Sequence, residues 1–370
     1  MDLNEIRMQI DQLDQSILHL FDQRMELCQQ VAAYKKAHHM EIFQEGREAV
    51  IMERIGKAAQ PQFMHAAQTL FSTMLDLSKQ LQTQMLTQEE PIPQFSIPQF
   101  SAAQKIGCQG MEGANSEQAA KQLFPEREIT FFPTFESVFE AVEEGKIEYG
   151  VLPIYNSTAG SVTATYDLLH KHSVYLAAMT TVAVNHCLVT RPGLSLDEIH
   201  TVYSHPQGLS QCSDFLSHHN LIGQGYSNTA TAAKLVADSD APIAAICSEN
   251  CAKLNHLQIL AQNISNVSPN YTRFICITKE LQVDPNASII SIMLTIPNEP
   301  GSLSKLLEKF YIYNLNLDRI ESRPIQDGSF GVVFHIDFKG NLNDRKVAAF
   351  LNSLCKFCMN FKLLGNVVVQ

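Results

Sequence analysis

One long helix is predicted for residues 2–39, DLNEIRMQIDQLDQSILHLFDQRMELCQQVAAYKKAHH, because this stretch contains neither proline nor glycine. Its apolar residues recur at the spacing of one helix face: Ile6, Ile10, Leu13, Ile17, Leu20, Leu27 and Val31. Arg24 and Lys35 are expected to project with this stripe. A buried cation costs several kcal/mol unless a negative group pairs with it, so the two side chains predict a small bound dianion.

Two further helical stretches place polar groups on inward faces. The stretch 45–59 carries Glu48 on its apolar side, and the stretch 62–86 carries Ser78 and Gln82, which share a face because they are four residues apart. Taken singly, each of these residues is explained as well by polar pairing in the core of an ordinary helical bundle. Five inward polar groups on three helices, with the two cations included, favour a binding site instead.

A second copy of the chain is expected at this site. Arg7 lies 28 residues before Lys35, about 42 Å away along a straight helix, so one chain cannot bring both to one ligand. Two antiparallel copies of the long helix would place Arg7 of one chain beside Lys35 of the other. The sequence therefore predicts a dimer with shared sites.

Residues 1–87 resemble the all-helical chorismate mutase family through Arg7, Arg24, Lys35, Arg47, Glu48, Ser78 and Gln82. The resemblance implies that the three arginines bind the two carboxylates of chorismate. It also implies that Lys35 and Gln82 hydrogen-bond the ether oxygen and that Glu48, helped by Ser78, holds the ring hydroxyl; Lys35, Glu48 and Gln82 are the catalytic groups. Gln44, where many relatives carry aspartate, is kept among the substrate-binding residues. Such a rearrangement needs a compact substrate and positive charge at the oxygen.

Composition excludes several classes of partner. The chain has 27 lysines and arginines against 38 aspartates and glutamates, which argues against nucleic acid. No apolar run approaches the roughly 18 residues of a membrane span, and the N-terminus is an amphipathic helix rather than a signal peptide, so no membrane partner and a cytoplasmic location are expected. The nine cysteines are scattered, which predicts reduced thiols and no metal site.

A linker is predicted at residues 88–103, because the sequence IPQFS occurs twice in tandem after Pro91 and its prolines oppose helix and sheet pairing. Residues 104–280 alternate strand-like and helix-like runs, which indicates an α/β fold with mostly parallel strands in two lobes. The last runs, 259–261 and 273–278, are expected to return to the first lobe. A ligand cleft is expected between the lobes.

Polar residues gather where these strands pass into helices. Residues 153–161 read PIYNSTAGS, residues 203–207 read YSHPQ and residues 228–233 read NTATAA. Each alone is typical of a helix cap, but their recurrence around one cleft favours recognition of carboxylates by free N–H groups. The GxGxxG and Walker A patterns are absent, and no cofactor is expected.

The segment NYTRF at 270–274, with TVYSHPQ at 201–207 and the pair Asn156–Ser157, resembles prephenate dehydratase over residues 104–280. The resemblance implies a two-lobed fold like that of periplasmic binding proteins. It also implies that Thr272 is essential near the departing ring hydroxyl and that Arg273 shapes or binds at the carboxylate end. Because a threonine hydroxyl is a poor acid, we interpret Thr272 as a hydrogen-bond relay or a water positioner rather than a strong proton source. The rest of the implied pocket is Ser116, Asn156, Ser157, Thr158, Ser204, His205, Gln211, Thr229 and Phe274. Tyr155 and Asn115 depart from the family, which usually has glutamate and an aromatic residue there.

Residues 288–370 have the order strand, helix, strand, strand, helix, strand, which is typical of a ferredoxin-like α+β domain. PGSL at 300–303 and ESRP at 321–324 resemble the amino-acid-sensing ACT module. That resemblance implies a phenylalanine site between two paired copies, built from Pro300, Gly301, Ser302, Leu303, Glu321, Ser322, Arg323 and Pro324. A plain dimerisation module is the alternative from the pattern alone.

The three resemblances, in this order, imply a multidomain, bifunctional mutase and dehydratase of phenylalanine biosynthesis that phenylalanine inhibits. The expected partners are chorismate, prephenate, phenylalanine and further copies of the chain in a homodimer or homotetramer. Two alternatives stay open. One is a two-lobed sensor without chemistry, against which Thr272 and Arg273 argue, and the other is an enzyme active only as a mutase, which the departures at Tyr155 and Asn115 keep open.

Overall fold

The computed structural model describes residues 2–40, 45–87, 94–325 and 331–369. The chain divides into two compact units. The first unit comprises Met1–Gln94, Thr295–Asp318 and Leu342–Phe361, and the second comprises Phe95–Leu294, Arg319–Asn341 and Lys362–Gln370.

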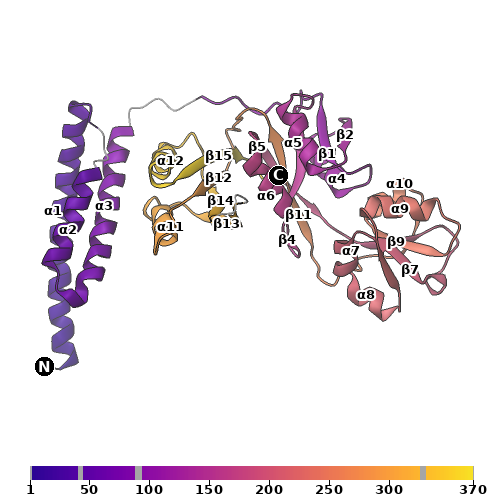
Figure 1. Cartoon of the computed structure of the whole chain (residues 1–370), viewed down its shortest axis with the longest axis horizontal. Helices are drawn as coiled ribbons and strands as arrows, with labels where there is room; N and C mark the ends of the chain where they lie inside the picture. Colours follow the sequence, from indigo (N-terminus) through magenta and orange to yellow (C-terminus); the bar gives the residue numbers. More distant parts are fainter. Residues whose placement is uncertain (1, 41–44, 88–93, 326–330, 370) are drawn as a thin grey trace. The chain divides into compact units, whose positions relative to one another are not determined.

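The first unit is helical. Its helices are α1 (Leu3–Ala37), α2 (Glu45–Ala58), the 3-10 turn η1 (Pro61–Phe63), α3 (Met64–Thr87), α11 (Ser302–Ile312) and α12 (Arg345–Phe357). The carboxylate of Asp2 starts α1 by accepting hydrogen bonds from the backbone N–H groups of Asn4 and Glu5, while the Glu5 side chain accepts from the Asp2 N–H. Helices α1, α2, α11 and α12 all contact α3, and the three N-terminal helices are drawn in indigo to purple in Figure 1.

The apolar stripe of α1 faces away from the bundle, which differs from the sequence prediction. Leu13, Ile17 and Leu20 are 62%, 58% and 63% exposed, and the other members of the stripe are exposed as well. Arg24 and Lys35 nevertheless turn inward towards α3. The two cations lie at the edge of the stripe, so α1 has an inner face with the cations and an outer apolar face that a single chain leaves uncovered.

The second unit contains two sheets. The first runs in the order β13-β14-β12-β15-β5-β11-β3-β1-β2, with β4 paired to β3. Its strands are β1 (Ile106–Gln109), β2 (Ile129–Phe132), β3 (Tyr149–Asn156), β4 (Gly160–Ser161), β5 (Tyr175–Ala183), β11 (Tyr271–Thr278), β12 (Ile289–Thr295), β13 (Leu317–Pro324), β14 (Val332–Lys339) and β15 (Asn360–Val367). The helices between the first-lobe strands are α4 (Asn115–Leu123), α5 (Phe135–Glu143) and α6 (Thr163–Lys171).

The second sheet forms the second lobe and has the order β10-β6-β9-β7-β8. Its strands are β6 (Cys187–Thr190), β7 (Thr201–Ser204), β8 (Ile222–Gly225), β9 (Ile243–Cys247) and β10 (Gln258–Ala261). The helical segments around it are η2 (Leu196–Glu198), α7 (Pro206–Gln211), α8 (Ser213–His218), α9 (Thr229–Ala237) and α10 (Glu249–Leu254). Both sheets are visible in Figure 1, the second in the pink and red part of the chain.

The two-lobed α/β organisation agrees with the sequence prediction, but the sheets are mixed rather than mostly parallel. Strand β11 is antiparallel to both β3 and β5, and β6 is antiparallel to β9 and β10. The chain leaves the first lobe after β5 and returns through β11, which enters the sheet in the opposite direction. Of the two runs expected to return, only 273–278 does so, because 259–261 stays in the second sheet.

The C-terminal segment has the expected strand and helix order, and its sheet continues into the first lobe. Gly365 of β15 pairs with Leu176 of β5. The approach is so close that a Cβ on Gly365 would lie 2.4 Å from the Leu176 carbonyl oxygen, which only glycine avoids. Beside it, the buried Asn366 amide donates hydrogen bonds to the carbonyls of Ile289 and Gly340. Strand β15 therefore joins two parts of one continuous sheet.

The described part of the predicted linker is bound to the first lobe rather than free. Ser96 forms a bridge with Gln282, and the Phe100 ring packs on those of Phe124 and Tyr149. The phenylalanine of the second repeat copy is thus partly buried against the first lobe, whereas residues 88–93 lie outside the described residues. No helix within the described ranges has an apolar run suited to crossing a membrane.

Candidate active sites

The inward faces of α1 and α3 bring four of the predicted polar residues together. Arg24 Nη1 donates to Ser78 Oγ at 2.5 Å and to the Met74 carbonyl at 3.2 Å. About three turns further along α1, Lys35 Nζ donates to Gln82 Oε1 at 3.3 Å. Lys35, Ser78 and Gln82 are buried. Burial lowers the pKa of Lys35, while Glu48 and Cys28 act in the opposite direction. A dehydrated cation of this kind is a strong donor to a developing negative charge.

Glu48 of α2 faces a cation that sequence analysis did not single out. Lys79 Nζ lies 3.2 Å from the Glu48 carboxylate and 2.7 Å from that of Asp76. Burial opposes the charge on Lys79, but the two carboxylates outweigh it and raise the lysine pKa. The signal in the sequence was the position of Lys79 directly after Ser78. Whether Lys79 points towards Glu48 or towards solvent depends on how α2 and α3 are rotated against each other.

The remaining mutase residues stand apart from this group. Arg7 and Arg47 are exposed, and no hydrogen bond or ion pair joins either to the four inward residues in the part of the chain that the structure describes. Gln44 lies outside the described residues. The single chain therefore presents a partial cation site.

A second polar group lies at the end of β3 in the second unit. Thr272 of β11 is the register partner of Asn156. The Asn156 amide donates to Thr272 Oγ1 at 2.9 Å and to Asn270 Oδ1 at 2.7 Å. Its carbonyl oxygen accepts from Thr158 Oγ1 at 2.7 Å and from the Ala159 N–H at 2.8 Å. Asn156 and Thr272 are both buried, so Asn156 organises a polar cluster inside the sheet edge.

The second lobe reaches this cluster through α7. Gln211 Nε2 donates to Thr158 Oγ1 at 2.9 Å, and Gln211 Oε1 lies 2.9 Å from His186 Nε2. Burial lowers the pKa of His186, so the imidazole is neutral near pH 7 and its Nε2–H donates to Gln211. His186 was absent from the sequence prediction, and Asn270 was noted only as part of its motif. Neither signal was strong, because a histidine after a strand and an asparagine before one are common.

Two of the predicted pocket residues, Ser204 and Phe274, are fully buried. Ser204 is fully buried and donates its hydroxyl hydrogen to the Ile246 carbonyl. Phe274 packs in the hydrophobic core. The roles of Ser204 and Phe274 in the pocket stay predictions, and the structure shows that both side chains also serve hydrogen bonding or packing.

The other predicted residues have local structural contacts. Ser157 Oγ accepts from the Tyr271 N–H at 2.9 Å, and His205 Nδ1 accepts from the Gln207 N–H at the start of α7. Thr229 begins α9 and Ser116 lies in the first turn of α4. Arg273 is half-buried on β11 beside Thr272.

The two departures from the dehydratase pattern lie outside the hydrogen-bonded cluster. Successive residues of a strand point to opposite faces, so Tyr155 faces away from its neighbour Asn156. The Tyr155 ring instead lies 4.2 Å from the guanidinium of Arg319 on β13. Asn115 is the first residue of α4.

The ESRP strand is bound to the first lobe. Glu321 accepts a hydrogen bond from Ser161 Oγ at 2.7 Å, and Arg319 Nη2 donates to the same Ser161 oxygen at 2.7 Å. Arg323 lies 3.3 Å from the Asp167 carboxylate on α6. Among the other residues of the two motifs, Ser302 is buried, and Pro300, Gly301, Leu303, Ser322 and Pro324 are exposed.

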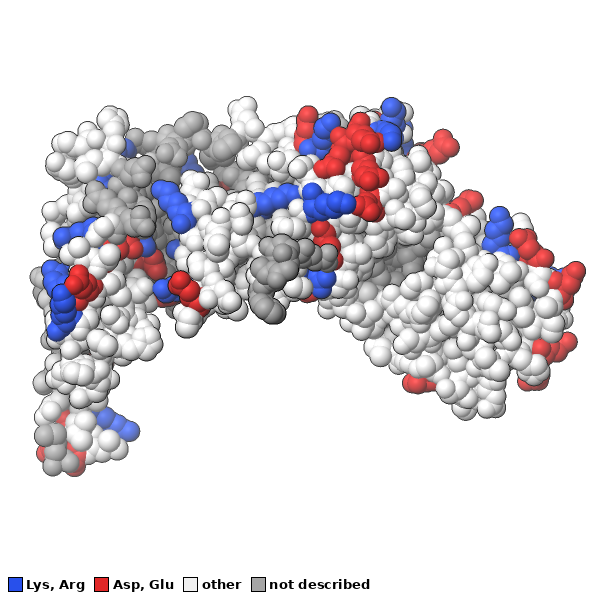
Figure 2. All heavy atoms as spheres, viewed as in Figure 1, with Lys and Arg blue, Asp and Glu red and all other residues white. Residues whose placement is uncertain are grey.

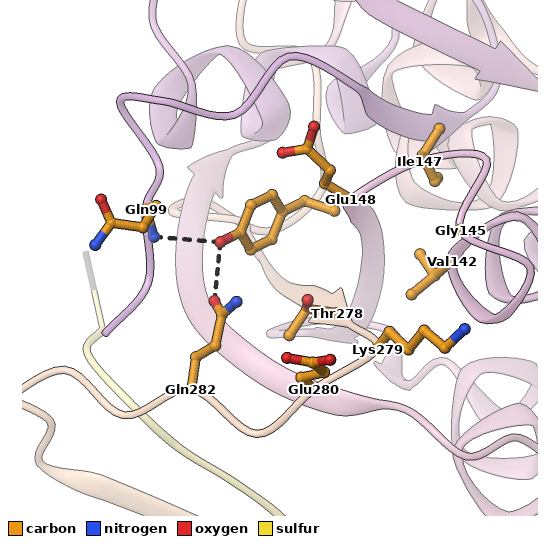
Figure 3. A pocket seen from close by; sticks show the side chains of 10 residues that line it. Gln99, Val142, Gly145, Ile147, Glu148, Thr278, Lys279, Glu280 and Gln282 are labelled. Atoms are coloured by element: carbon orange, nitrogen blue, oxygen red, sulfur yellow. Dashed lines mark hydrogen bonds between the residues drawn. The ribbon is translucent and has the colours of Figure 1, made fainter. Parts of the chain in front are cut away.

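A hollow elsewhere in the described structure contains none of the predicted residues. It has a volume of about 310 Å³ and is lined by Gln99, Val142, Gly145, Ile147, Glu148, Tyr149, Thr278, Lys279, Glu280 and Gln282. Figure 3 shows how the Tyr149 hydroxyl, which accepts from the Gln99 N–H and donates to Gln282, ties the end of the linker to the sheet. We interpret the hollow as a surface recess beside the point where the linker is attached to the sheet.

Charges are mixed over the molecular surface, without a single basic face in the view of Figure 2. The part drawn at the right of that figure, the second lobe, is largely uncharged on this side. The described residues contain no cluster of three or more histidines, cysteines, aspartates or glutamates that could hold a metal.

Comparisons with known proteins match both sites. Residues 106–282 match the family model for prephenate dehydratase, and residues 6–83 match that for chorismate mutase type II. The bifunctional chorismate mutase/prephenate dehydratase of Enterobacter agglomerans is 30% identical over 371 residues, which are 97% of this chain and 94% of that protein. Arogenate dehydratase/prephenate dehydratase 2 of Arabidopsis thaliana is 33% identical over 278 residues, 72% of this chain and 73% of that protein.

Among solved structures, the prephenate dehydratase of Arthrobacter aurescens in complex with L-Phe is similar with a TM-score of 0.66 and 28% identity. The matched region is 71% of this chain and 89% of the Arthrobacter aurescens chain. The two family matches, their order and the identity over nearly the whole length lead to one conclusion. The chain belongs to the family of bifunctional chorismate mutase/prephenate dehydratases.

Proposed function

We propose that the N-terminal helices rearrange chorismate to prephenate and that the two-lobed domain converts prephenate to phenylpyruvate, with phenylalanine as feedback inhibitor. One observation carries the proposal. The chain holds two buried polar clusters of different chemistry, one cationic on helices α1 and α3 and one uncharged around Asn156 and Thr272. Each suits one of the two reactions.

In the mutase step, the enzyme binds a dianion and stabilises charge without transferring a proton. The carbon–oxygen bond of the ether breaks while a carbon–carbon bond forms, and negative charge grows on the oxygen. Lys35 and the amide of Gln82, now in contact with each other, would both donate to that oxygen. Arg24 would hold a carboxylate of the substrate, and Glu48 would accept the ring hydroxyl. Donors already fixed by burial need no reorganisation during the reaction.

A second copy of the chain completes the mutase site in this proposal. Arg7 is exposed, and so are the apolar residues of the outer face of α1. Antiparallel pairing of two α1 helices would bury that face and bring Arg7 of one chain to Lys35 of the other. The area of uncovered apolar side chains supports a homodimer, or a homotetramer built from such dimers.

In the dehydratase step, Thr272 is the proposed proton-donating contact. Because the Asn156 amide donates to Thr272 Oγ1, the threonine hydrogen points away from Asn156 and is available to the departing ring hydroxyl. The carboxylate leaves as carbon dioxide, its electron pair enters the ring, and the hydroxyl leaves as water with one added proton. Aromatisation drives the step, so a modest donor in a dry site suffices. Arg273 pairs in register with Tyr155 and points to the face of β11 opposite Thr272, so its proposed role is to shape the carboxylate end of the site.

Phenylalanine is proposed to bind at the C-terminal segment, at Pro300–Leu303 and the ESRP strand. Two observations support this part. L-Phe is bound in the structure of the Arthrobacter aurescens relative. In addition, β13 is joined to the first lobe through Glu321, Arg319 and Ser161, so a ligand on this strand has a physical connection to the dehydratase. A cytoplasmic location is part of the same proposal, because all nine cysteines are unpaired thiols.

One assay tests the whole proposal. The purified full chain is given chorismate, and prephenate and phenylpyruvate are separated and quantified over time, with and without phenylalanine. Both products are expected in sequence, and phenylalanine is expected to slow the second. Chorismate that stays unchanged would contradict the mutase role, and accumulation of prephenate alone would contradict the dehydratase role. A parallel reaction with arogenate tests the second substrate that the name of the Arabidopsis relative suggests.

A further inference from the structure

Helix α11 of the C-terminal segment belongs to the same compact unit as α3, and polar side chains join the two helices. Thr73 Oγ1 donates to the Glu308 carboxylate, and Gln80 Nε2 donates to the Ile312 carbonyl at 2.9 Å. Thr73 and Gln80 are seven residues apart, two turns along one face of α3. The contact is therefore a defined pairing of helix faces.

The centre of this contact is a row of alternating charges. Lys309 Nζ of α11 lies 3.9 Å from Asp76, Asp76 lies 2.7 Å from Lys79, and Lys79 lies 3.2 Å from Glu48. The four side chains are 13%, 18%, 27% and 29% exposed, in that order from Lys309 to Glu48. Their formal charges cancel, and their partial burial means that water compensates poorly for the loss of any one.

The row ends on the residue proposed to hold the ring hydroxyl of chorismate. Lys79 stands between two carboxylates, and its distance to Asp76 is already the shorter of the two. Lys309 attracts the Asp76 carboxylate as well, from helix α11. Without Lys309, Lys79 would be the remaining charged partner of Asp76 among the described residues, and the attraction of Lys79 to Glu48 would weaken.

We propose that Lys79 and Lys309 are positioning residues for the mutase reaction, and that Lys309 makes helix α11 of the C-terminal segment part of the support of the mutase site. Neither lysine contacts the substrate. Lys79 holds the Glu48 carboxylate in place, and Lys309 balances Asp76 so that Lys79 remains available to Glu48. This inference rests on the proposed mutase function and on the role of Glu48 in it.

The test uses four variants of the full chain: Lys79→Met, Lys309→Met, Lys309→Arg and Lys305→Met. Lys305 is an exposed lysine on the same helix and serves as the matched control. Mutase kcat and KM are measured with chorismate, and dehydratase turnover is measured separately with prephenate.

The loss of a charge-assisted hydrogen bond corresponds to about a tenfold or larger fall in mutase kcat/KM for Lys79→Met. The longer contact of Lys309 predicts a fall of about threefold for Lys309→Met. Lys309→Arg should restore most of the rate, and Lys305→Met should match the wild type. Dehydratase turnover should be unchanged in all four, which also shows that the chains are folded.

The double variant Lys79→Met/Lys309→Met decides whether the two lysines act in one row. If they do, it loses no more mutase activity than Lys79→Met alone. Independent, multiplying losses would overturn the inference, and so would a Lys309→Met chain with the wild-type mutase rate or with equal losses in both activities. A wild-type chain that leaves chorismate unchanged would overturn the mutase function itself, so the two failures are distinguishable.

Discussion

The replacement Thr272→Val separates the chemical role of this threonine from its structural one. Valine has nearly the shape of threonine and exchanges the hydroxyl for a methyl group. Thr272 is 9% exposed, so the change is made inside the protein. Thr272 Oγ1 now accepts one hydrogen bond, from the Asn156 amide at 2.9 Å.

The structural cost of this change is small. The Asn156 amide keeps Asn270 Oδ1 at 2.7 Å and the Tyr271 carbonyl at 3.2 Å as acceptors, enough for its two hydrogens. The loss of one hydrogen bond therefore costs about 1 kcal/mol of stability. The loss of a positioned proton donor lowers a rate about 10²- to 10⁴-fold, which corresponds to about 3 to 5 kcal/mol of barrier.

The assay follows phenylpyruvate from prephenate and, on the same preparation, prephenate from chorismate. We expect Thr272→Val to lose at least about a hundredfold in dehydratase kcat and to keep the wild-type mutase rate. Thr272→Ser keeps a hydroxyl and should recover most of the activity. The reasoning is refuted if the valine variant stays within about tenfold of the wild type, or if the valine and serine variants are equally slow.

Four further outcomes are expected. Lys35→Met should abolish prephenate formation and leave turnover of added prephenate intact; equal loss of both activities would speak against separate sites. Arg7→Ala should also inactivate the mutase. Refolding the Arg7→Ala chain together with the Lys35→Met chain should restore up to about a quarter of the wild-type activity, because half of the dimers then carry one intact shared site. No recovery would contradict the shared site. Glu321→Gln should weaken phenylalanine inhibition of the dehydratase without changing uninhibited turnover, because its bond to Ser161 loses charge. Burial, with nearby cations, lowers the pKa of His335 from 6.5 to about 3. The neutral histidine therefore contributes stability above pH 6.5 that is lost as the pH falls, about 2 kcal/mol by pH 5. The free energy of unfolding of His335→Leu in urea should depend less on pH between 7 and 5, and an unchanged dependence would exclude this residue as a cause.

The order of helices and strands was predictable because it depends on local periodicity. The strand and helix order of residues 288–370 and the return of 273–278 to the first lobe both agree with the structure. Strand direction was not predictable, since β11 fits antiparallel between β3 and β5 only because the chain crosses to the second lobe and back.

The candidate sites were predictable where one motif contains the interacting residues or where helix spacing aligns them. Arg24 contacts Ser78, and Asn156 contacts Thr272; the sequence analysis assigned the members of each pair to one site but did not predict these contacts. Lys79 was missed because its direction depends on the rotation of one helix against another. The outward turn of the apolar stripe on α1 was missed for a related reason: an apolar face shows that something covers it, but not whether the cover is the same chain.

Gly365 lies where strand β15 of the C-terminal segment joins strand β5 of the first lobe. Any side chain there would collide with the Leu176 backbone and separate β15 from β5, and β5 in turn pairs with β11, the strand that carries Thr272. Gly365→Ala is therefore expected to weaken the link between the C-terminal segment and the first lobe, through which the proposed phenylalanine site would act.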